Sequence, residues 1–247
     1  MSRFEAIRSG AFWLLLSLLI PQALWVRRRA PRFSPPDGPR RGAVGSGPVR
    51  RLVGLGDSVI DGVGCRSLHT ALVGRTAEAL AARLPCTVEW SVSARTGART
   101  RSIRRRLLPD AEIERADFVI VSTGVNDVTG LISVDDFRRE LDLLLEDIRK
   151  RSPNAVVAVN GIPPMHRFPA LPQPLRFTFG LRARQLDAVV GEIADRKENV
   201  YRVAIEFGPG DEVMIRRFAP DGYHPSESSC SELAEALAES MIDAEEH

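Results

Sequence analysis

The stretch RLVGLGDSVIDGVG, residues Arg51–Gly64, joins an apolar run to a glycine-rich segment around Asp57 and Ser58. Apolar, β-branched runs of this kind are typical of strands that are buried on both faces of a parallel sheet. In α/β proteins ligands bind at the carboxyl ends of such strands, which is where Ser58 falls. Two interpretations compete: a glycine loop that holds a phosphate group, and a serine nucleophile held at a strand end.

Short apolar runs alternate with longer helical patterns through the rest of the chain. The predicted strands are Leu52–Gly56, Thr87–Val92, Phe118–Thr123, Ala155–Gly161 and Val200–Ile205. The predicted helices, with apolar residues three and four apart, are His69–Leu84, Val134–Lys150, Leu181–Arg196 and Glu227–Ile242. Ser133 or Asp135 could cap the second helix. This alternation predicts the α/β class, a three-layer α/β/α arrangement with a parallel sheet covered on both faces.

The phosphate interpretation fails on the residues that follow the strand. A P-loop ends in Gly-Lys-Ser/Thr, and no lysine lies near Ser58. A dinucleotide-binding loop needs a third small residue where Val59 stands, and no suitable acidic residue ends the next predicted strand. The serine interpretation therefore remains.

A serine hydroxyl is a weak nucleophile until a base removes its proton. Of the four histidines, His224 in APDGYHPSE has the most suitable surroundings, because Asp221 precedes it by three residues on an Asp-Gly turn. A carboxylate placed there can orient the imidazole and stabilise its protonated form. The other three lie at the terminus, in a predicted helix and in a proline-rich loop (His247, His69 and His166).

Two more strand ends carry groups that can donate hydrogen bonds to an oxyanion. Asn126 follows the third predicted strand in STGVNDV, and its side-chain amide is a donor. Gly97 follows the second predicted strand in SARTGART, and its backbone N–H is not screened by a side chain. One such donor is typically worth a factor of about 10²–10³ in rate.

Taken in order, Gly-Asp-Ser, the second-strand glycine, Gly-x-Asn-Asp and Asp-x-x-His resemble the SGNH (GDSL) hydrolase family over about Leu52–Ile242. The resemblance implies a flavodoxin-like sheet of five parallel strands in the order 2-1-3-4-5. It also implies a serine esterase, thioesterase or lipase that uses neither a metal nor a cofactor. The sequence departs from the family where Val59 replaces a frequent leucine and where SVSAR lacks the asparagine usually found before the glycine.

The resemblance assigns a role to each matching position. Ser58 corresponds to the nucleophile, His224 to the base and Asp221 to the residue that orients the base. The backbone N–H of Ser58, Gly97 and Asn126 correspond to the three oxyanion donors. Asp57 and Asp127 lie inside the same motifs and are expected to hold turns together.

The segment PPMHRFPALPQPLRFTFG, residues Pro163–Gly180, is expected to be a long apolar loop. It could line an acyl-binding site or face a membrane, or it could be an ordinary packed connection. The candidate substrate-binding residues are Phe168, Leu171, Leu175 and Phe177. With the membrane anchor described below, they favour acyl-lipid or lysophospholipid esters. The alternatives are a carbohydrate O-acetyl esterase and an inactive membrane-tethered scaffold.

The arginines around Gly97 allow two interpretations. They could attract an anionic part of a substrate, or they could form the solvated face of a charged helix. They are Arg95, Arg99, Arg101 and Arg104–Arg106.

The N-terminal region differs in composition from the rest of the chain. Residues 9–26 carry no charge, which predicts a membrane anchor within residues 1–29, followed by a Pro/Gly/Arg-rich linker at 30–50 and the hydrolase domain at 51–247. The arginines that follow the apolar segment favour a cytoplasmic catalytic domain. A cleaved signal peptide, with export to the periplasm, and a peripheral helix are the alternatives.

Charge and cysteine content argue against a nucleic-acid-binding protein, a zinc site and a disulfide framework. Residues 1–51 hold ten arginines and two acidic residues, whereas the remainder holds 24 basic and 30 acidic residues. A nucleic-acid partner is therefore not expected, because the folded body lacks excess positive charge. Cys65, Cys86 and Cys230 show no zinc or disulfide spacing and are expected to be reduced thiols.

Overall fold

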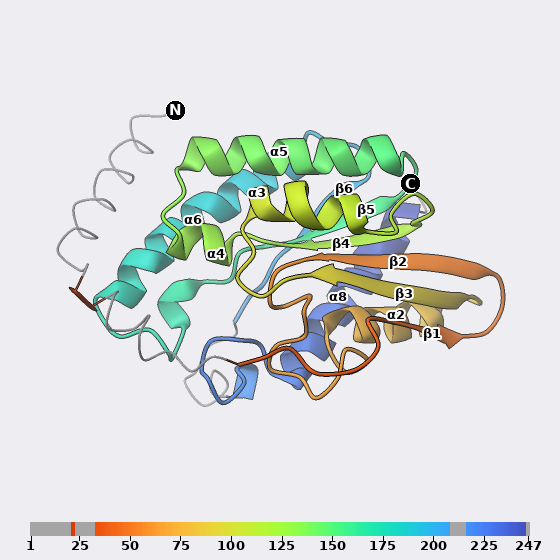
Figure 1. Ribbon diagram of the computed structural model, residues 1–247, viewed down its shortest axis with the longest axis horizontal. Coiled ribbons are helices and arrows are strands. Elements are labelled where there is room, and N and C mark those ends of the chain that lie inside the picture. Colours follow the sequence, from red (N-terminus) through yellow and green to blue (C-terminus); the bar gives the residue numbers. More distant parts are fainter. Residues whose placement is uncertain (1–20, 23–32, 208–215, 246–247) are drawn as a thin grey trace.

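The computed structural model describes residues 21–22, 33–207 and 216–245. A six-stranded sheet lies at its centre, with the strand order β1-β3-β2-β4-β5-β6 (Figure 1). The strands are β1 Arg41–Gly45, β2 Val49–Gly56, β3 Thr87–Ala94, β4 Phe118–Ser122, β5 Val156–Asn160 and β6 Val200–Val203.

The five predicted strands are confirmed, and they pair in parallel in the predicted order. The sheet is nevertheless mixed rather than wholly parallel, because β1 adds a sixth strand antiparallel to β3. This strand lies in the segment that we expected to be a linker. An edge strand needs only one backbone partner and one half-buried face. The sequence of β1, RGAVG, therefore lacks the continuous apolar run by which the other strands were predicted.

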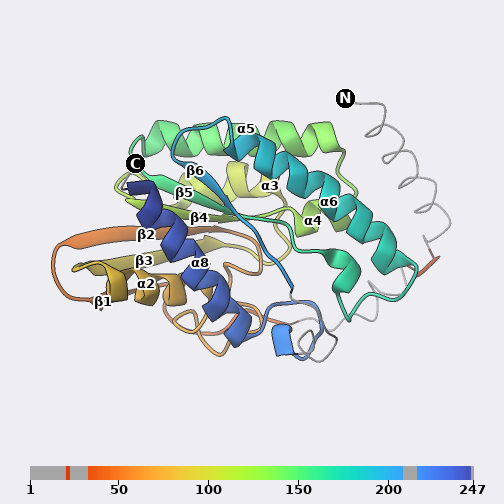
Figure 2. The ribbon, with the colours of Figure 1, turned by 180° about the vertical axis from the view of Figure 1, so that it is seen from behind.

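Helices cover both faces of the sheet (Figures 1 and 2). The helices α2 and α8 pack on one face, and their core includes Leu72, Leu80 and Leu237. The longer helices on the other face are α5 and α6, whose core includes Leu141 and Leu186. The long helices are α2 Leu72–Arg83, α5 Val134–Arg151, α6 Leu175–Ala194 and α8 Glu227–Glu245. The short ones are α3 Thr100–Ser102, η1 Ile103–Leu107, η2 Leu108–Asp110, α4 Val125–Thr129 and η3 Met165–Arg167.

Local signals account for where the helices begin. Ser133 caps α5, because its hydroxyl oxygen accepts a hydrogen bond from the N–H of Asp136 at 3.0 Å. The helix α6 begins at Leu175, earlier than the predicted Leu181. Its first turns carry the apolar residues that we expected in a loop, and Leu175 and Phe179 are buried four residues apart. The expected loop over Pro163–Gly180 is thus partly helical.

The strand register brings the candidate site together. Gly56 at the end of β2 pairs with Ala94 of β3 and with Ser122 of β4. The segments that follow these three strands, which carry Ser58, Gly97 and Asn126, therefore leave the sheet at the same edge.

The predicted membrane anchor lies outside the described residues, except for residues 21–22. Among the residues that the structure describes, no helix has the length and apolar content required to cross a membrane.

Candidate active site

Three side chains form a continuous hydrogen-bonded chain at the carboxyl edge of the sheet. The hydroxyl of Ser58 lies 3.0 Å from Nε2 of His224, and Nδ1 of His224 lies 2.6 Å from Oδ2 of Asp221. A carboxylate only accepts hydrogen bonds, so Nδ1 carries the proton and Nε2 is left to accept the Ser58 proton. The arrangement has the geometry of a nucleophile, a general base and an orienting carboxylate.

The Asp-Gly turn explains how two residues so close in sequence can pair. Oδ1 of Asp221 accepts the backbone N–H groups of Tyr223 and His224 at 2.9 and 3.0 Å, which leaves Oδ2 for the imidazole. Gly222 completes the turn with a φ of +65°, a value that favours glycine. Burial alone would raise the pKa of Asp221, but the hydrogen bonds from His224 and Tyr223 outweigh it and lower the pKa. The carboxylate is therefore ionised at neutral pH.

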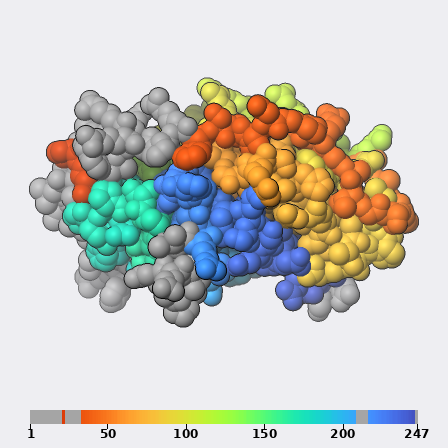
Figure 3. Space-filling model, turned by 90° about the horizontal axis from the view of Figure 1, so that it is seen from below, coloured from red at the N-terminus to blue at the C-terminus, as the bar shows by residue number. Residues whose placement is uncertain are grey.

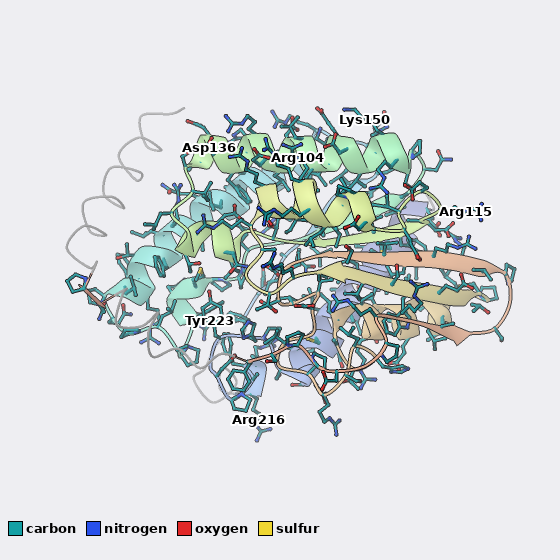
Figure 4. The ribbon with its side chains drawn as sticks, in the orientation of Figure 1. Arg104, Arg115, Asp136, Lys150, Arg216 and Tyr223 are labelled. Carbon is teal, nitrogen blue, oxygen red and sulfur yellow. The ribbon has the colours of Figure 1, made fainter. Side chains whose placement is uncertain are left out.

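The ring of Tyr223 supports the imidazole from the side. Its centroid lies 5.3 Å from that of His224 and 5.2 Å from that of Phe168, with both pairs edge to face. Tyr223 lies beyond the carboxyl ends of the strands, close to η3 (Figure 4). Sequence reasoning missed this residue, although its place inside the Asp-x-x-His motif was a usable signal.

Asp57 holds the Ser58 turn, as we expected from its place in the motif. Its buried carboxylate accepts the N–H of Val59 at 3.1 Å and the hydroxyl of Ser122 at 3.1 Å. The backbone N–H of Asp57 also donates to the carbonyl of Ser122. Burial raises the pKa of Asp57 to about 6. These bonds tie the segment after β2 to the end of β4 and orient Ser58.

The two other oxyanion candidates are adjacent to each other. Gly97 is the third residue of a turn in which the N–H of Ala98 donates to the carbonyl of Arg95, and its φ is +80°. Nδ2 of Asn126 donates one hydrogen to the carbonyl of Ala98 at 3.1 Å, which leaves its second hydrogen for another acceptor. Within 33–207 and 216–245, the N–H groups of Ser58 and Gly97 donate to no protein acceptor.

Asp61, which sequence reasoning missed, positions the Gly97 turn. Its Oδ2 accepts both the N–H and the hydroxyl of Thr96, at 2.9 and 2.7 Å, and its Oδ1 pairs with Arg40 at 2.9 Å. Arg40 belongs to the N-terminal stretch that runs along the surface before β1 (Figure 3). A buried carboxylate thus fixes Thr96, the residue that precedes Gly97.

We expect Asp61→Ala to lower kcat by roughly 10–100-fold with little change in KM, since an ångström-scale displacement of a catalytic group can cost about 100-fold. Asp61→Asn should retain most of the activity, because its amide oxygen can still accept from Thr96. Steady-state kinetics on a nitrophenyl ester, with thermal melting as a check on folding, measures both. An Asp61→Ala protein that is folded and has unchanged kcat would show that the turn needs no such support.

Asp127 holds the next turn, also as expected. Its Oδ2 accepts the N–H and the hydroxyl of Thr100 at 3.1 and 3.0 Å, and the Thr100 hydroxyl lies 2.8 Å from that of Thr123. Burial raises the pKa of Asp127 from 3.8 to about 6. The folded state therefore binds this proton more tightly than the unfolded state, and this group's contribution to stability falls as pH rises from about 4 to 6.

Asp127→Asn should remove the fall in stability that accompanies ionisation of Asp127, because an amide oxygen can accept the same hydrogen bonds and never ionises. The free energy of unfolding of the variant, relative to the wild type, should rise by on the order of 3 kcal/mol between pH 4 and pH 7. Urea denaturation at the two pH values measures it. The exposed Asp37→Asn is the matched control, and a difference independent of pH in Asp127→Asn would contradict the ionisation argument.

A cavity of about 350 Å³ opens beside Ser58 and His224. Its walls are mostly apolar and come from the ends of β4, β5 and β6 and from α8; they include Val59, Phe168, Phe207, Phe218, Leu233 and Ala236. Asn160, at the end of β5, also lines it and is 2% exposed, yet neither polar atom of its amide has a hydrogen-bond partner among the described residues. Its sequence signal was the single polar side chain in the otherwise apolar run AVVAVNG.

The structure separates the candidate substrate-binding residues. Phe168 lines the cavity. Leu171 and Leu175 instead pack in the apolar core, 3% and 0% exposed, and neither lines this cavity. Phe177 is 49% exposed on the first turn of α6 and does not line the cavity. For Leu175 and Phe177 the physical reason is helix formation, since α6 turns Leu175 inward and leaves Phe177 exposed.

Two of the arginines after Gly97 contact acidic residues of α5. Arg104 lies between η1 and α5, where its guanidinium bonds Glu140 at 2.9 Å and Asp147 at 3.4 Å (Figure 4). Arg101 also approaches Glu140, at 3.7 Å. The charged-helix interpretation therefore holds for these two residues.

Known proteins are similar to this chain in sequence and in fold. A GDSL-like esterase of Mycobacterium tuberculosis, Rv1075c, is 30% identical over 250 residues, which span 92% of this chain and 77% of the relative. A lipase/acylhydrolase structure from Enterococcus faecalis superposes with a TM-score of 0.58 at 21% identity, over 78% of this chain and 96% of that one. A carbohydrate esterase family 2 enzyme of Corynascus thermopiles gives 0.58 at 18% identity, over 83% and 69%.

The structural likenesses, at such low identity, support the fold alone. The model of the GDSL-like lipase/acylhydrolase family matches residues 55–228, from the end of β2 into the first turn of α8, and so takes in the Ser58, Asn126 and His224 segments together. With that match and the M. tuberculosis relative, this chain belongs to the GDSL-like lipase/acylhydrolase family.

Proposed function

We propose that this hydrolase cleaves carboxylic or thio esters through an acyl-enzyme on Ser58. His224 removes the Ser58 proton through Nε2 as the oxygen attacks the carbonyl carbon, and the bond to the leaving group breaks as His224 returns that proton to it. Water, activated by the same imidazole, then releases the acid and regenerates Ser58. The observation that carries this proposal is the unbroken chain of short contacts from Ser58 through His224 to Asp221.

Three donors would stabilise the tetrahedral oxyanion: the N–H groups of Ser58 and Gly97 and the free hydrogen of the Asn126 amide. Each is held by the fold rather than by solvent. The turn at Arg95–Ala98 fixes Gly97, and the bond to Ala98 fixes Asn126. Donors that are already oriented need no rearrangement when charge develops on the substrate oxygen.

For the substrate we propose an acyl-lipid or lysophospholipid ester. The apolar cavity beside Ser58 offers room for an acyl chain. Phe177 presents an apolar ring to solvent on α6, and the start of the same helix contacts Gln22, which lies within the predicted anchor. There the Gln22 amide donates to the carbonyl of Gln173 at 2.9 Å and accepts the N–H of Leu175 at 3.2 Å.

A panel of nitrophenyl esters from acetyl to dodecanoyl, with acetylated xylan as the competing substrate, tests the substrate class. We expect kcat/KM to rise with chain length, and Phe168→Ala to reduce the gain for long chains more than for acetyl. Preference for acetyl esters or acetylated sugar would favour a carbohydrate O-acetyl esterase. Absence of turnover together with absence of fluorophosphonate labelling of Ser58 would favour an inactive scaffold.

We also propose that the charge-free residues 9–26 anchor the protein to a membrane, with the catalytic domain in the cytoplasm. The support is the sequence itself: an uncharged segment about long enough to span a bilayer, followed at once by arginines. Full-length protein should sediment with membranes and resist extraction by high salt, whereas protein lacking residues 1–29 should not. Full-length protein recovered in the soluble fraction would contradict the anchor.

A further inference from the structure

Two thiols that are 165 residues apart in sequence meet beside the candidate active site. Sγ of Cys65, in the loop between β2 and α2, lies 3.7 Å from Sγ of Cys230 on α8. Cys230 is buried and Cys65 is half-buried, so one thiol of the pair is open to a small reagent. The spacing of the cysteines in the sequence contains no sign of this pairing, which arises only when the loop packs on the helix. A disulfide has an S–S length of about 2.05 Å, so the two sulfur atoms must approach each other further to form a bond.

Polar contacts hold the two segments against each other. Glu227, one turn before Cys230 on α8, accepts the N–H of Arg66 at 2.8 Å and pairs with its guanidinium at 3.0 Å. The same carboxylate accepts the hydroxyl of Thr70 at 2.8 Å. The loop thus meets α8 through Glu227 at two residues that follow Cys65 in the chain, and the space-filling view shows the two segments in contact (Figure 3). These contacts keep the segment that carries Cys65 against the helix that carries Cys230.

The pair adjoins the segment that carries the histidine. Gly64 lies so close to it that a Cβ at this position would stand 2.7 Å from the carbonyl oxygen of Pro225 and 3.4 Å from Cβ of His224. At its other end, the same loop begins with Ser58, whose carbonyl accepts the N–H of Val63. A bond between Cys65 and Cys230 would therefore join the segment that carries Ser58 to the one that carries His224.

We propose that Cys65 and Cys230 are a redox modification site, at which a small disulfide such as oxidised glutathione converts the two thiols to a reversible intramolecular disulfide. The inference rests on the cysteine geometry and is independent of the proposed substrate and mechanism.

The chemistry proceeds in two exchanges. The Cys65 thiolate attacks one sulfur of oxidised glutathione, forming a mixed disulfide and releasing one glutathione thiolate. The Cys230 thiolate then attacks Sγ of Cys65 and releases the second glutathione. Two protein thiols lose two electrons and two protons, and one glutathione disulfide becomes two glutathione molecules. The hydrogen bond with Cys230 lowers the pKa of Cys65, whereas the pKa of Cys230 is raised, so Cys65 is the attacking group.

The test treats the folded full-length chain with excess oxidised glutathione, blocks remaining thiols and maps the products by peptide mass spectrometry. We expect a peptide pair linked through Cys65 and Cys230, reversed by dithiothreitol. The Cys230→Ser variant should instead retain glutathione on Cys65, because no second thiol displaces it. The Cys86→Ser variant should behave as the wild type. Glutathione that stays on Cys65 of the wild type, a link that involves Cys86, or no reaction at all would overturn the proposal.

A second measurement does not depend on the variants. Closing a long loop with a disulfide should raise Tm by roughly 5–10 °C in the oxidised wild type, and dithiothreitol should reverse the rise. Oxidised protein that carries the link but melts at the same or a lower temperature would show that the fold does not hold the thiols in bonding register.

Discussion

Replacing Ser58 with alanine should lower kcat by a factor of roughly 10⁴–10⁶, because the attacking oxygen is lost while the oxyanion donors and the cavity remain. His224→Ala should cost about as much. The double variant should be little worse than either single variant, since the two side chains act as a unit joined by their 3.0 Å contact. Steady-state kinetics on a nitrophenyl ester measures the three values.

Ser91→Ala is the matched control for Ser58→Ala. Ser91 lies in the middle of β3, where it pairs with Val53, and so stands several residues back from the catalytic edge of the sheet. It should keep wild-type turnover and be labelled by a fluorophosphonate, whereas Ser58→Ala should not be labelled. A Ser58→Ala protein with near-full activity would show that Ser58 is not the nucleophile.

Asp221→Asn should lower kcat by a factor on the order of 10⁴ while leaving the turn intact. The reason is that the two carboxylate oxygens of Asp221 have different partners. Oδ1 accepts two backbone N–H groups, so the amide oxygen of the asparagine takes that place and its NH₂ group must face Nδ1 of His224. Nδ1 then becomes an acceptor and Nε2 carries the proton. An imidazole in that tautomer cannot take the proton of Ser58.

Three measurements distinguish a wrong tautomer from a broken turn. The Asn variant should melt near the wild-type temperature, because both backbone bonds survive, and KM should change little. Asp221→Ala loses those bonds as well and should be less stable. A loss of less than tenfold in kcat for folded Asp221→Asn would mean that this carboxylate does not control the state of His224.

Part of this architecture could be predicted from local patterns. Strands buried on both faces appear in the sequence as continuous apolar runs, which is why the five parallel strands are evident. The cap at Ser133 and the glycines at strand ends depend on neighbours within a few residues. The Asp221–His224 pair is also a local feature, since one turn brings the carboxylate and the imidazole together.

Other features depend on contacts between distant segments and carry no local signal. The strand β1 exists because β3 supplies its hydrogen bonds, and composition does not show an available edge. Leu171 and Leu175 are apolar whether they line a site or a core; only the packing of α6 places them inside. Asp61 supports the Gly97 turn through Thr96, a partner 35 residues away.

The strand pattern, the order of the motifs and the short-range turn around His224 were thus readable along the chain, because each depends on side chains a few bonds apart. Packing decided the contact of Cys65 with Cys230, the position of the Asn160 amide beside the cavity and the carboxylate that holds the Gly97 turn. Such contacts are set by the register of the sheet and the docking of α8, which bring together residues that have no relation in the linear sequence.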